Sequence, residues 1–383
     1  MVKVFGRFLV DLASGAVRHT LPESPASMVQ DDDAVCTLRD GVVRAFGLAD
    51  GTPRWQAALP AQSRQMTIDR GELFIATRDA VLSFALADGT RRDLFAGVVE
   101  NFVVSGDTLA IRVQGGDVVV AGRDGAVRAR IAASPADRLP NGVDHLLEGS
   151  GEIPAVILEA LEHRFLVRGV RADGGIAWKA EVDHSEMLSR DASSGMYFYL
   201  NFEAATERHL LFTSHWSTFR HPASVVLRVT DGARVAENER HVSALVERAD
   251  GTLEGLLTVD PVKNQLVLLE PGSGRTRWSA RAPSATHRRA DAALSGSSLA
   301  VVQYDAVAAG ARLVLLELAD GLTNWQGEVE ERSAFERTPL FLNAWSVRVE
   351  GNRVVLLGDE SAGTTAQVFD LADGRRLWSA LRL

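Results

Sequence analysis

Three histidines in one segment are the first candidates for chemistry in this chain of 383 residues. His209, His215 and His221 stand six positions apart, so in an unbroken β-strand their side chains would share one face. Six residues of strand span about 20 Å, which is too far for two of these histidines to bind one metal ion. A strand that held all three would also exceed the usual length. The spacing therefore favours an elongated hairpin with surface histidines over a metal site.

Aromatic residues surround these histidines. The run MYFYLNF covers 196–202, and RHLLFTSHWSTFRH covers 208–221. Tyr and Trp are enriched at the energetic centres of protein–protein interfaces. An alternative interpretation of the segment is therefore a docking surface for a protein partner, made by Tyr197, Tyr199, His215, Trp216 and Phe219.

No other segment carries a catalytic or cofactor-binding motif. Asp31–Asp33 lacks the alternating acidic spacing and the terminal Glu of a calcium loop. A phosphate-binding loop is absent because none of the three lysines follows a glycine, and no G-x-S-x-G elbow occurs. Cys36, the single cysteine, lies in an apolar run and is expected to be buried and inert. We therefore expect no enzyme activity, no cofactor and no metal.

The charge balance argues against nucleic acid as the main partner. The chain has 41 Lys and Arg against 50 Asp and Glu, a formal net charge of −9, whereas phosphate binding needs a basic face. No apolar run of about 18 residues predicts a membrane span. Arg7 and Asp11 interrupt what would be the apolar core of a signal peptide. We expect a cytoplasmic protein.

A short phrase recurs nine times and dominates the rest of the sequence. It reads LADGTPRW at 48–55 and LADGLTNW at 318–325. An apolar or alternating run precedes each copy, as at 42–46, and Asp-Gly or Ser-Gly supplies the positive φ of a tight hairpin turn. The phrase therefore predicts one hairpin per repeat. Its turn glycines are Gly15, Gly51, Gly89, Gly125, Gly174, Gly232, Gly274, Gly321 and Gly374.

Five copies carry a tryptophan four residues after the turn glycine. Because the position recurs in register, we expect each indole to pack between adjacent sheets rather than to stack on a ligand. The repeat tryptophans are Trp55, Trp178, Trp278, Trp325 and Trp378.

The repeat length predicts a β-propeller. The turns recur every 45 residues or so, which suits a four-stranded blade, and no long segment shows helical periodicity with caps. We predict an all-β chain that forms a single propeller over 1–383, with eight antiparallel blades. The hairpin of residues 1–20 would contribute to ring closure or lie against the last blade. Seven blades, with one interval as an insertion, are the alternative, and nine are less favoured.

The D/S-G-x-x-x-W turn resembles the tryptophan-docking repeat of the PQQ-like β-propellers over residues 11–378. That superfamily includes quinoprotein alcohol dehydrogenases and the propeller lipoprotein of the outer-membrane assembly machine. The repeat is structural and hosts many functions. The quinoprotein site uses a vicinal disulfide and calcium, and a single cysteine excludes that disulfide. The assembly lipoprotein has a lipidated N-terminal cysteine, a context that Cys36 lacks.

The chain is also similar to cytoplasmic bacterial propellers encoded beside MoxR-like AAA+ ATPases and von Willebrand A proteins. This resemblance implies a protein partner, such as an AAA+ ATPase or another multi-component bacterial assembly. The Lys-poor, Arg- and Ala-rich composition agrees with a bacterial source.

The binding face is expected opposite the Asp-Gly hairpins. In a propeller the loops between blades, and those between second and third strands, lie on that face, and loops carry function more often than the scaffold. We therefore expect a non-enzymatic scaffold that binds its partner through the loops at 132–142, 182–195, 205–223, 282–292 and 331–345. The later loops contribute Arg288, Arg289 and Phe341.

Two other functions stay open. One is an enzyme or cofactor binder that uses the central channel, as in the quinoprotein relatives. The other is a module that binds sugars or the cell envelope, which would require a signal sequence.

Overall fold

A computed structural model shows the chain as strands, turns and loops, with no helix among the described residues. None of these residues belongs to a helix that could cross a membrane. The predicted all-β class is confirmed. The structure describes residues 2–5, 7–11, 14–22, 25–134, 144–161, 164–183, 189–190, 197–198, 201–206, 208–213, 224–260, 262–282, 290–305, 310–329, 344–360 and 363–380.

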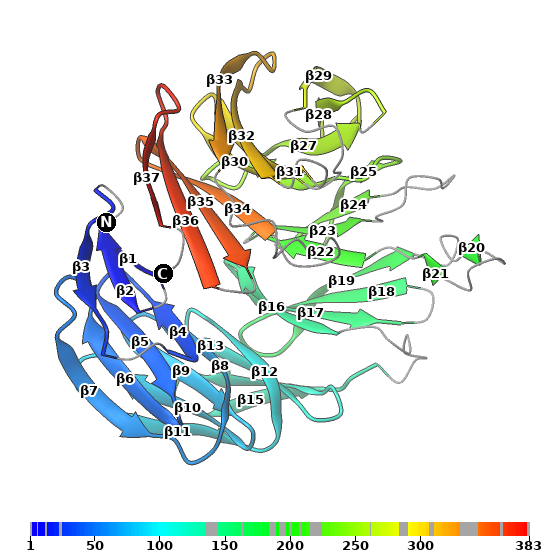
Figure 1. Cartoon of the computed structure of the whole chain (residues 1–383). Helices are drawn as coiled ribbons and strands as arrows, with labels where there is room; N and C mark the ends of the chain where they lie inside the picture. The colour runs from blue at the N-terminus through cyan, green and yellow to red at the C-terminus, as the bar shows by residue number, and fades with distance from the viewer. Residues whose placement is uncertain are drawn as a thin grey trace. The chain divides into compact units, whose positions relative to one another are not determined.

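Eight four-stranded sheets follow one another along the described chain, each with its strands in sequential order (Figure 1). We number them sheets 2 to 9, because a three-stranded sheet 1 precedes them. Sheet 1 consists of β1 (Val2–Phe5), β2 (Phe8–Asp11) and β3 (Val17–Thr20). Sheet 2 consists of β4 (Ser27–Gln30), β5 (Ala34–Arg39), β6 (Val42–Gly47) and β7 (Pro53–Ala58). Sheet 3 consists of β8 (Ser63–Asp69), β9 (Glu72–Thr77), β10 (Ala80–Ala85) and β11 (Arg91–Ala96).

The middle of the chain forms three further sheets and one short strand pair. Sheet 4 consists of β12 (Val99–Ser105), β13 (Thr108–Val113), β14 (Val118–Gly122) and β15 (Val127–Ile131). Sheet 5 consists of β16 (His145–Ser150), β17 (Ile153–Ala160), β18 (Arg164–Val170) and β19 (Ile176–Asp183). The short pair is β20 (Ser189–Arg190) and β21 (Tyr197–Phe198). Sheet 6 consists of β22 (Asn201–Ala205), β23 (His209–Thr213), β24 (Ser224–Arg228) and β25 (Arg234–Asn238).

The last three sheets follow the same plan. Sheet 7 consists of β26 (Ala244–Glu247), β27 (Leu253–Asp260), β28 (Gln265–Leu269) and β29 (Thr276–Arg281). Sheet 8 consists of β30 (Ala290–Ser295), β31 (Ser298–Asp305), β32 (Gly310–Glu317) and β33 (Thr323–Val329). Sheet 9 consists of β34 (Ala344–Glu350), β35 (Arg353–Glu360), β36 (Gly363–Asp370) and β37 (Arg376–Ala380).

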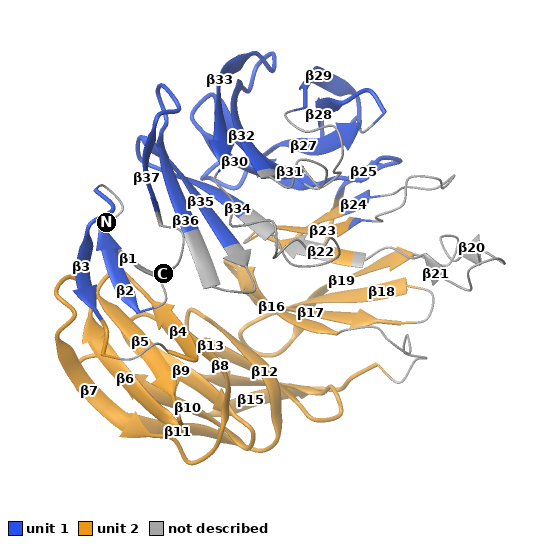
Figure 2. Cartoon of the chain, viewed as in Figure 1, with its two compact units in different colours: residues 1–20, 213–225, 235–383 blue, residues 21–212, 226–234 orange. Residues whose placement is uncertain are grey.

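The chain divides into two compact units (Figure 2). One unit, residues 21–212 and 226–234, holds sheets 2 to 5. The other unit, residues 1–20, 213–225 and 235–383, holds sheets 1, 7, 8 and 9, and sheet 6 has residues in both. The single eight-bladed ring stays a prediction.

The second and third strands of a sheet are buried on both faces. All six residues of β13 and all eight of β17 are buried, whereas in the fourth strand β19 exposed positions alternate with partly buried ones and with the buried Val182. A strand needs apolar residues on both faces when other sheets cover both of its sides. The core therefore consists of layers between sheets, such as the one that Phe74 of sheet 3 and Phe102 of sheet 4 share.

The nine phrase turns share one hydrogen bond. In every copy the Asp or Ser side chain accepts the backbone N–H of the residue after the glycine, at distances from 2.7 Å for Asp173 to 3.3 Å for Ser14. All nine turn glycines have positive φ. In sheets 2 to 9 the turn joins the third and fourth strands. The side chain before the glycine therefore closes the turn that the glycine's backbone makes accessible.

Four repeat tryptophans donate the same hydrogen bond to the next phrase. The Nε1–H of Trp55 donates to the carbonyl of Leu86 at 3.0 Å. This acceptor is the first residue of the next phrase, three positions before the turn glycine Gly89. Bonds of 2.8 to 3.0 Å join the corresponding pairs Trp178–Val229, Trp278–Leu318 and Trp325–Leu371.

Each of these indoles also lies on the turn glycine of the next repeat. A Cβ atom added to Gly374 would lie 2.5 Å from Cδ2 of Trp325. Glycine is therefore required here for two reasons. The backbone has a positive φ, and the indole ring occupies the space where a Cβ atom would lie. The same contact occurs in the pairs Gly89–Trp55, Gly232–Trp178, Gly321–Trp278 and Gly15–Trp378.

Sheet 1 packs on sheet 9. Val10 of β2 shares a buried cluster with Val355 and Val368, and the turn at Gly15 lies against Trp378. The hairpin of residues 1–20 is therefore a three-stranded sheet of its own, so each of the nine turns lies in a separate sheet of the described chain.

Side chains on first strands bridge to the first strand of the next sheet. Gln65 accepts the N–H of Phe102 at 3.1 Å and donates to its carbonyl at 2.8 Å. The Oδ2 of Asp291 accepts the N–H of Val347 at 2.8 Å. Desolvation raises the pKa of the Asp291 carboxyl, and this effect outweighs the backbone N–H donors and Arg348, which lower it.

We predict that Gly374→Ala destabilises the protein more than Gly351→Ala does. Both glycines lie in turns of sheet 9 with positive φ, but an added Cβ meets nothing within 4 Å at Gly351. Each variant should lose about 1–2 kcal/mol for the left-handed backbone. Gly374→Ala should lose about 1–3 kcal/mol more, because its methyl group overpacks against Trp325. Urea unfolding of both variants measures the difference, and equal losses would contradict the indole contact.

A second prediction concerns the pH dependence of Asp291. Because its pKa is raised in the folded state, the free energy of unfolding falls as pH rises from the carboxyl's ordinary pKa through the raised one. Asp291→Asn removes the buried charge and keeps an oxygen for the N–H of Val347. The variant should therefore gain stability at about pH 7 and none at about pH 3. Thermal unfolding at both pH values tests this, and a loss at neutral pH is the contrary result.

Candidate functional site

A charged cleft lies where sheets 3 and 4 meet. Its volume is about 650 Å³. The loops between sheets contribute Ala61, Gln62 and Val98, and the turns between second and third strands contribute Arg78, Asp79 and Gln114. These segments lie at the strand ends opposite the Asp-Gly turns, as the strand order requires. The remaining lining residues are Arg64 of β8 and Glu100 of β12.

Backbone hydrogen bonds fix the loops that form the cleft. The N–H of Gly97 donates to the carbonyl of Asp79 at 2.9 Å, and that of Val99 donates to Arg78 at 3.0 Å. The N–H of Gln114 donates to Val98 at 3.0 Å. The turn of sheet 3, the loop between the sheets and the turn of sheet 4 are thus tied to one another, and the cleft is preformed.

The charges of the cleft are compensated unequally. Glu100 forms an ion pair with the buried Arg112 at 3.2 Å, and Arg112 also pairs with Asp144. Arg64 donates from Nη1 to the carbonyl of Val99 at 2.8 Å and has no carboxylate partner among the described residues. A guanidinium bound to a carbonyl keeps its positive charge and further N–H donors. The cleft therefore offers Arg64 to an incoming acceptor.

Arg78 is the second cation that the cleft presents. Its Nε lies 3.9 Å from Asp79, and the two side chains are 72% and 65% exposed. An exposed pair at that separation contributes little stability, so a partner can displace it at small cost. Arg64 and Arg78 are the cationic donors with which this cleft can hold carboxylate or carbonyl oxygens.

The charged groups in the lining of the cleft are Arg64, Arg78, Asp79 and Glu100. Among the described residues, the lining holds no His, Cys, Ser or Lys side chain. No group of three His, Cys, Asp or Glu residues within the described ranges could hold a metal ion. Cys36 is fully buried elsewhere, as expected, and desolvation raises the pKa of its thiol to about 12, so it is not a nucleophile.

The base of the predicted loop 132–142 is fixed to sheet 5. Glu159 of β17 accepts the backbone N–H of Ser134 at 2.7 Å, and Arg168 donates to the carbonyl of Ala132 at 3.2 Å. Glu159 and Arg168 form a buried ion pair at 2.8 Å. The described first residues of this loop, 132–134, are therefore held on sheet 5.

Sequence reasoning missed a buried hydrogen-bond chain in the unit that holds sheets 1, 7, 8 and 9. Ser224 donates to the carbonyl of Arg240 at 2.9 Å, so its oxygen accepts from the Thr213 hydroxyl at 2.8 Å. Thr213 then accepts from Nδ1 of His241 at 2.9 Å. Thr213 and Ser224 are at most 1% exposed, so no substrate reaches them. This series of hydrogen bonds gives the buried polar groups their partners.

The prediction of a surface position is wrong for His209, whose side chain is buried at 4% exposure. It lies in β23, a second strand, and both faces of such strands are covered. The strand ends at Thr213, so no single described strand joins the three histidines. Tyr197 lies in β21, opposite Arg190 of β20. The other candidate contacts fall outside the described residues: Tyr199, His215, Trp216, Phe219, His221, Arg288, Arg289 and Phe341.

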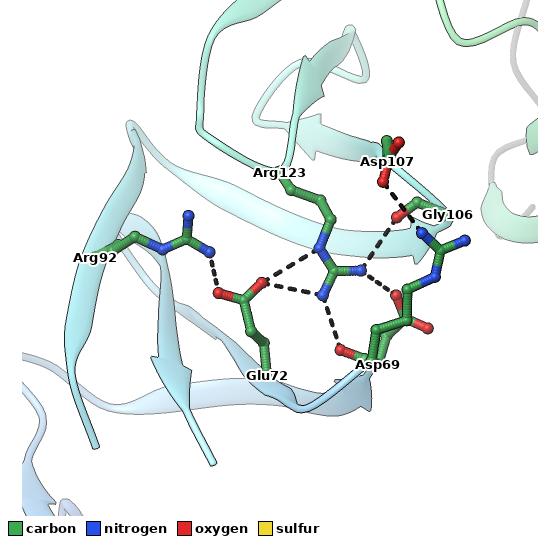
Figure 3. Close-up of polar contacts among 7 residues, drawn as sticks. Asp69, Glu72, Arg92, Gly106, Asp107 and Arg123 are labelled. Carbon is green, nitrogen blue, oxygen red and sulfur yellow. Dashed lines mark hydrogen bonds and ion pairs between the residues drawn. The ribbon is translucent and has the colours of Figure 1, made fainter. Parts of the chain in front are cut away.

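A second charged cluster lies at the turn end of sheets 3 and 4 (Figure 3). Arg123 donates to Glu72 at 3.0 and 3.2 Å, and to the carbonyls of Asp69 and Gly106 at 2.8 and 3.1 Å. It also pairs with the Asp69 carboxylate. Its guanidinium carbon lies 4.9 Å from the centre of the Phe74 ring, a cation–π contact. The N–H groups of Arg123 therefore bond to residues of the fold itself.

This cluster stands where the repeat tryptophan is missing. The phrase at 86–93 ends in Asp93 instead of Trp, and the next turn glycine, Gly125, lies against the backbone of Leu94. Arg123, from the turn of sheet 4, reaches back to sheet 3 in its place. We therefore assign the cluster a structural role and keep the cleft as the candidate site.

Comparisons with known proteins support the fold. A family model described as outer membrane protein assembly factor BamB matches residues 164–383. No curated protein matches the chain. A solved structure described as a eukaryotic initiation factor has a TM-score of 0.62 at 9% identity, covering 97% of this chain and 92% of that one.

Two further solved structures cover most of the chain. Dihydro-heme d1 dehydrogenase NirN, in complex with DHE, has a TM-score of 0.50 at 14% identity, with 94% of this chain and 75% of that chain covered. BamB from Moraxella catarrhalis has a TM-score of 0.49 at 14% identity, with coverage of 89% and 95%. The likeness to the initiation factor and to NirN shows a shared propeller fold.

We predict that Arg123 and Glu72 are strongly coupled. Because both side chains are less than one-fifth exposed, a double-mutant cycle with Arg123→Ala and Glu72→Ala should give a coupling of about 1–3 kcal/mol. The matched control is the pair Arg70–Asp107 beside it, whose side chains are 60% and 81% exposed and whose coupling should stay below about 0.5 kcal/mol. Denaturant unfolding measures both, and equal couplings would refute the role given to Arg123.

Proposed function

Because the chain belongs to the PQQ-like propeller family described as outer membrane protein assembly factor BamB, we propose that it is a non-enzymatic scaffold for a protein partner. The partner binds on the face opposite the Asp-Gly hairpins. The observation that carries this proposal is the cleft between sheets 3 and 4, which presents Arg64 of β8 and Arg78 of a turn fixed by backbone hydrogen bonds.

The chemistry of the cleft favours a polypeptide ligand. Interfaces pair arginine with carboxylate and carbonyl oxygens, and Val98, 36% exposed, adds an apolar contact beside the two cations. The described lining holds no histidine, cysteine, serine or lysine, and its two carboxylates, Asp79 and Glu100, lie in ion pairs with Arg78 and Arg112, which favours binding over turnover. An AAA+ ATPase or another bacterial assembly as the partner, and a cytoplasmic location, belong to the same proposal and rest on the sequence.

Capture of the partner tests this function. The chain is immobilised, exposed to an extract of its native host, and the bound proteins are identified by mass spectrometry. Arg64→Ala with Arg78→Ala should reduce capture of the identified partner about tenfold, because it removes both cationic donors that the cleft presents. Arg288→Ala with Arg289→Ala, and Trp216→Ala with Phe219→Ala, test the other predicted loops.

The matched control is Arg91→Ala with Arg92→Ala. It removes two arginines from β11, which starts at the Asp-Gly turn of the same sheet. This variant should retain full capture. Equal capture by the control and by all three loop-face variants, with all proteins folded by circular dichroism, would refute this face as the binding face.

A further inference from the structure

Sheet 1 lacks one strand that every other repeat sheet has. In sheets 2 to 9 the turn glycine lies between the third and fourth strands. In sheet 1, Gly15 lies between β2 and β3, so these are its third and fourth strands and β1 is its second. Among the described residues β1 pairs with β2 alone. The position of a first strand, beside β1, is therefore unfilled in the described chain.

The open edge of β1 presents defined backbone groups. Phe5 pairs with Phe8 across a connection of two residues, a hairpin whose closing pair exchanges hydrogen bonds. Because such pairs alternate in an antiparallel ladder, Lys3 also bonds to β2, whereas the N–H and C=O groups of Val2 and Val4 point to the open side. Backbone groups in this pattern are satisfied by another extended strand.

The apolar wall beside this position is also incompletely covered. The fifth residue of a second strand is Ala76 in β9 and Val302 in β31, which are 0% and 2% exposed. First strands of the following sheets cover them, as Val347 covers Val302. The corresponding residue of sheet 9 is Leu357, which faces sheet 1 and is only partly buried. Leu357 is left without the cover that a first strand gives.

We propose that this slot binds an extended segment of a partner protein, which adds to β1 as an antiparallel first strand. The other first strands indicate its sequence. They carry apolar residues two positions apart that face the preceding sheet: Met66 and Ile68, Phe102 and Val104, and Val347 and Val349. The segment therefore has apolar side chains at two alternate positions, which cover Leu357, while its backbone bonds to Val2 and Val4. This is recognition by strand addition, and it does not depend on the cleft.

A labelled synthetic peptide that copies residues 344–350, AWSVRVE, is the probe. In sheet 9 this strand pairs Glu350 with Arg353 across a connection of two residues. The backbone N–H and C=O groups of Ser346 and Arg348 therefore bond to the second strand, and those of Val347 and Val349 point away from it. The peptide should bind the full chain in a fluorescence anisotropy titration. N-methylation at Ser346 and Arg348 should abolish binding. N-methylation at Val347 and Val349, the matched control, should leave it within about twofold.

Two variants of the chain locate the bound peptide. Val4→Pro removes an N–H of the open edge and leaves the bonds of Lys3 and Phe5 to β2, so it should weaken binding about tenfold with the melting temperature unchanged. Leu357→Ser removes the apolar wall and should also weaken binding. Hydrogen exchange should show the amides of Val2 and Val4 open in the free chain and protected by the peptide.

Three results would overturn the proposal. The first is the absence of binding by the unmodified peptide. The second is equal binding by Val4→Pro and the unaltered chain. The third is protection of the Val2 and Val4 amides without peptide, which would show that the chain itself fills the slot.

Discussion

The fold depends on a joint in which an indole ring of one sheet lies on the turn glycine of the next. The ring buries its face on a residue without a side chain, and its N–H donates to a carbonyl three residues before that glycine. One residue pair thus sets both the separation and the register of two sheets. Because a four-stranded sheet cannot cover its own faces, such joints, together with the apolar layers between sheets, hold the repeats together. The Asp or Ser before the glycine holds the turn in the shape that the ring needs.

The joints without an indole differ, and one of them holds the candidate site. Between sheets 3 and 4 the turn ends are joined by Arg123, Asp69 and Glu72, and the first strands are joined by Gln65 and the backbone of Phe102. Beyond that bridge, at the opposite strand ends, the sheets leave the cleft. The apolar layer of Phe74 and Phe102 fills the space between the middles of these two sheets, and none of its residues lines the cleft. The cleft therefore lies outside the core.

The fold could be predicted from the sequence because the repeat contacts are the same in each copy. The phrase turns recur at a regular spacing, and Trp55, Trp278 and Trp325 each contact the turn of the next repeat. The cleft could not be predicted in this way, because its lining comes from separate loops, turns and strands that only the packing of sheets 3 and 4 brings together. Arg123 was missed because its partner Asp69 lies 54 residues away, with no recurring spacing. His209 was expected at the surface because its strand was not recognised as a second strand.

Hydrogen exchange at the indole nitrogens, followed by NMR on the intact chain, tests the joints between sheets most directly. The Nε1–H groups of Trp55, Trp178, Trp278 and Trp325 each donate to a carbonyl of the next repeat. We predict that these four exchange slowly, at rates set by opening of the joints between sheets. Exchange of the four at the rate of a free indole would show that the rings do not join the sheets, and the description of the fold would fail with them.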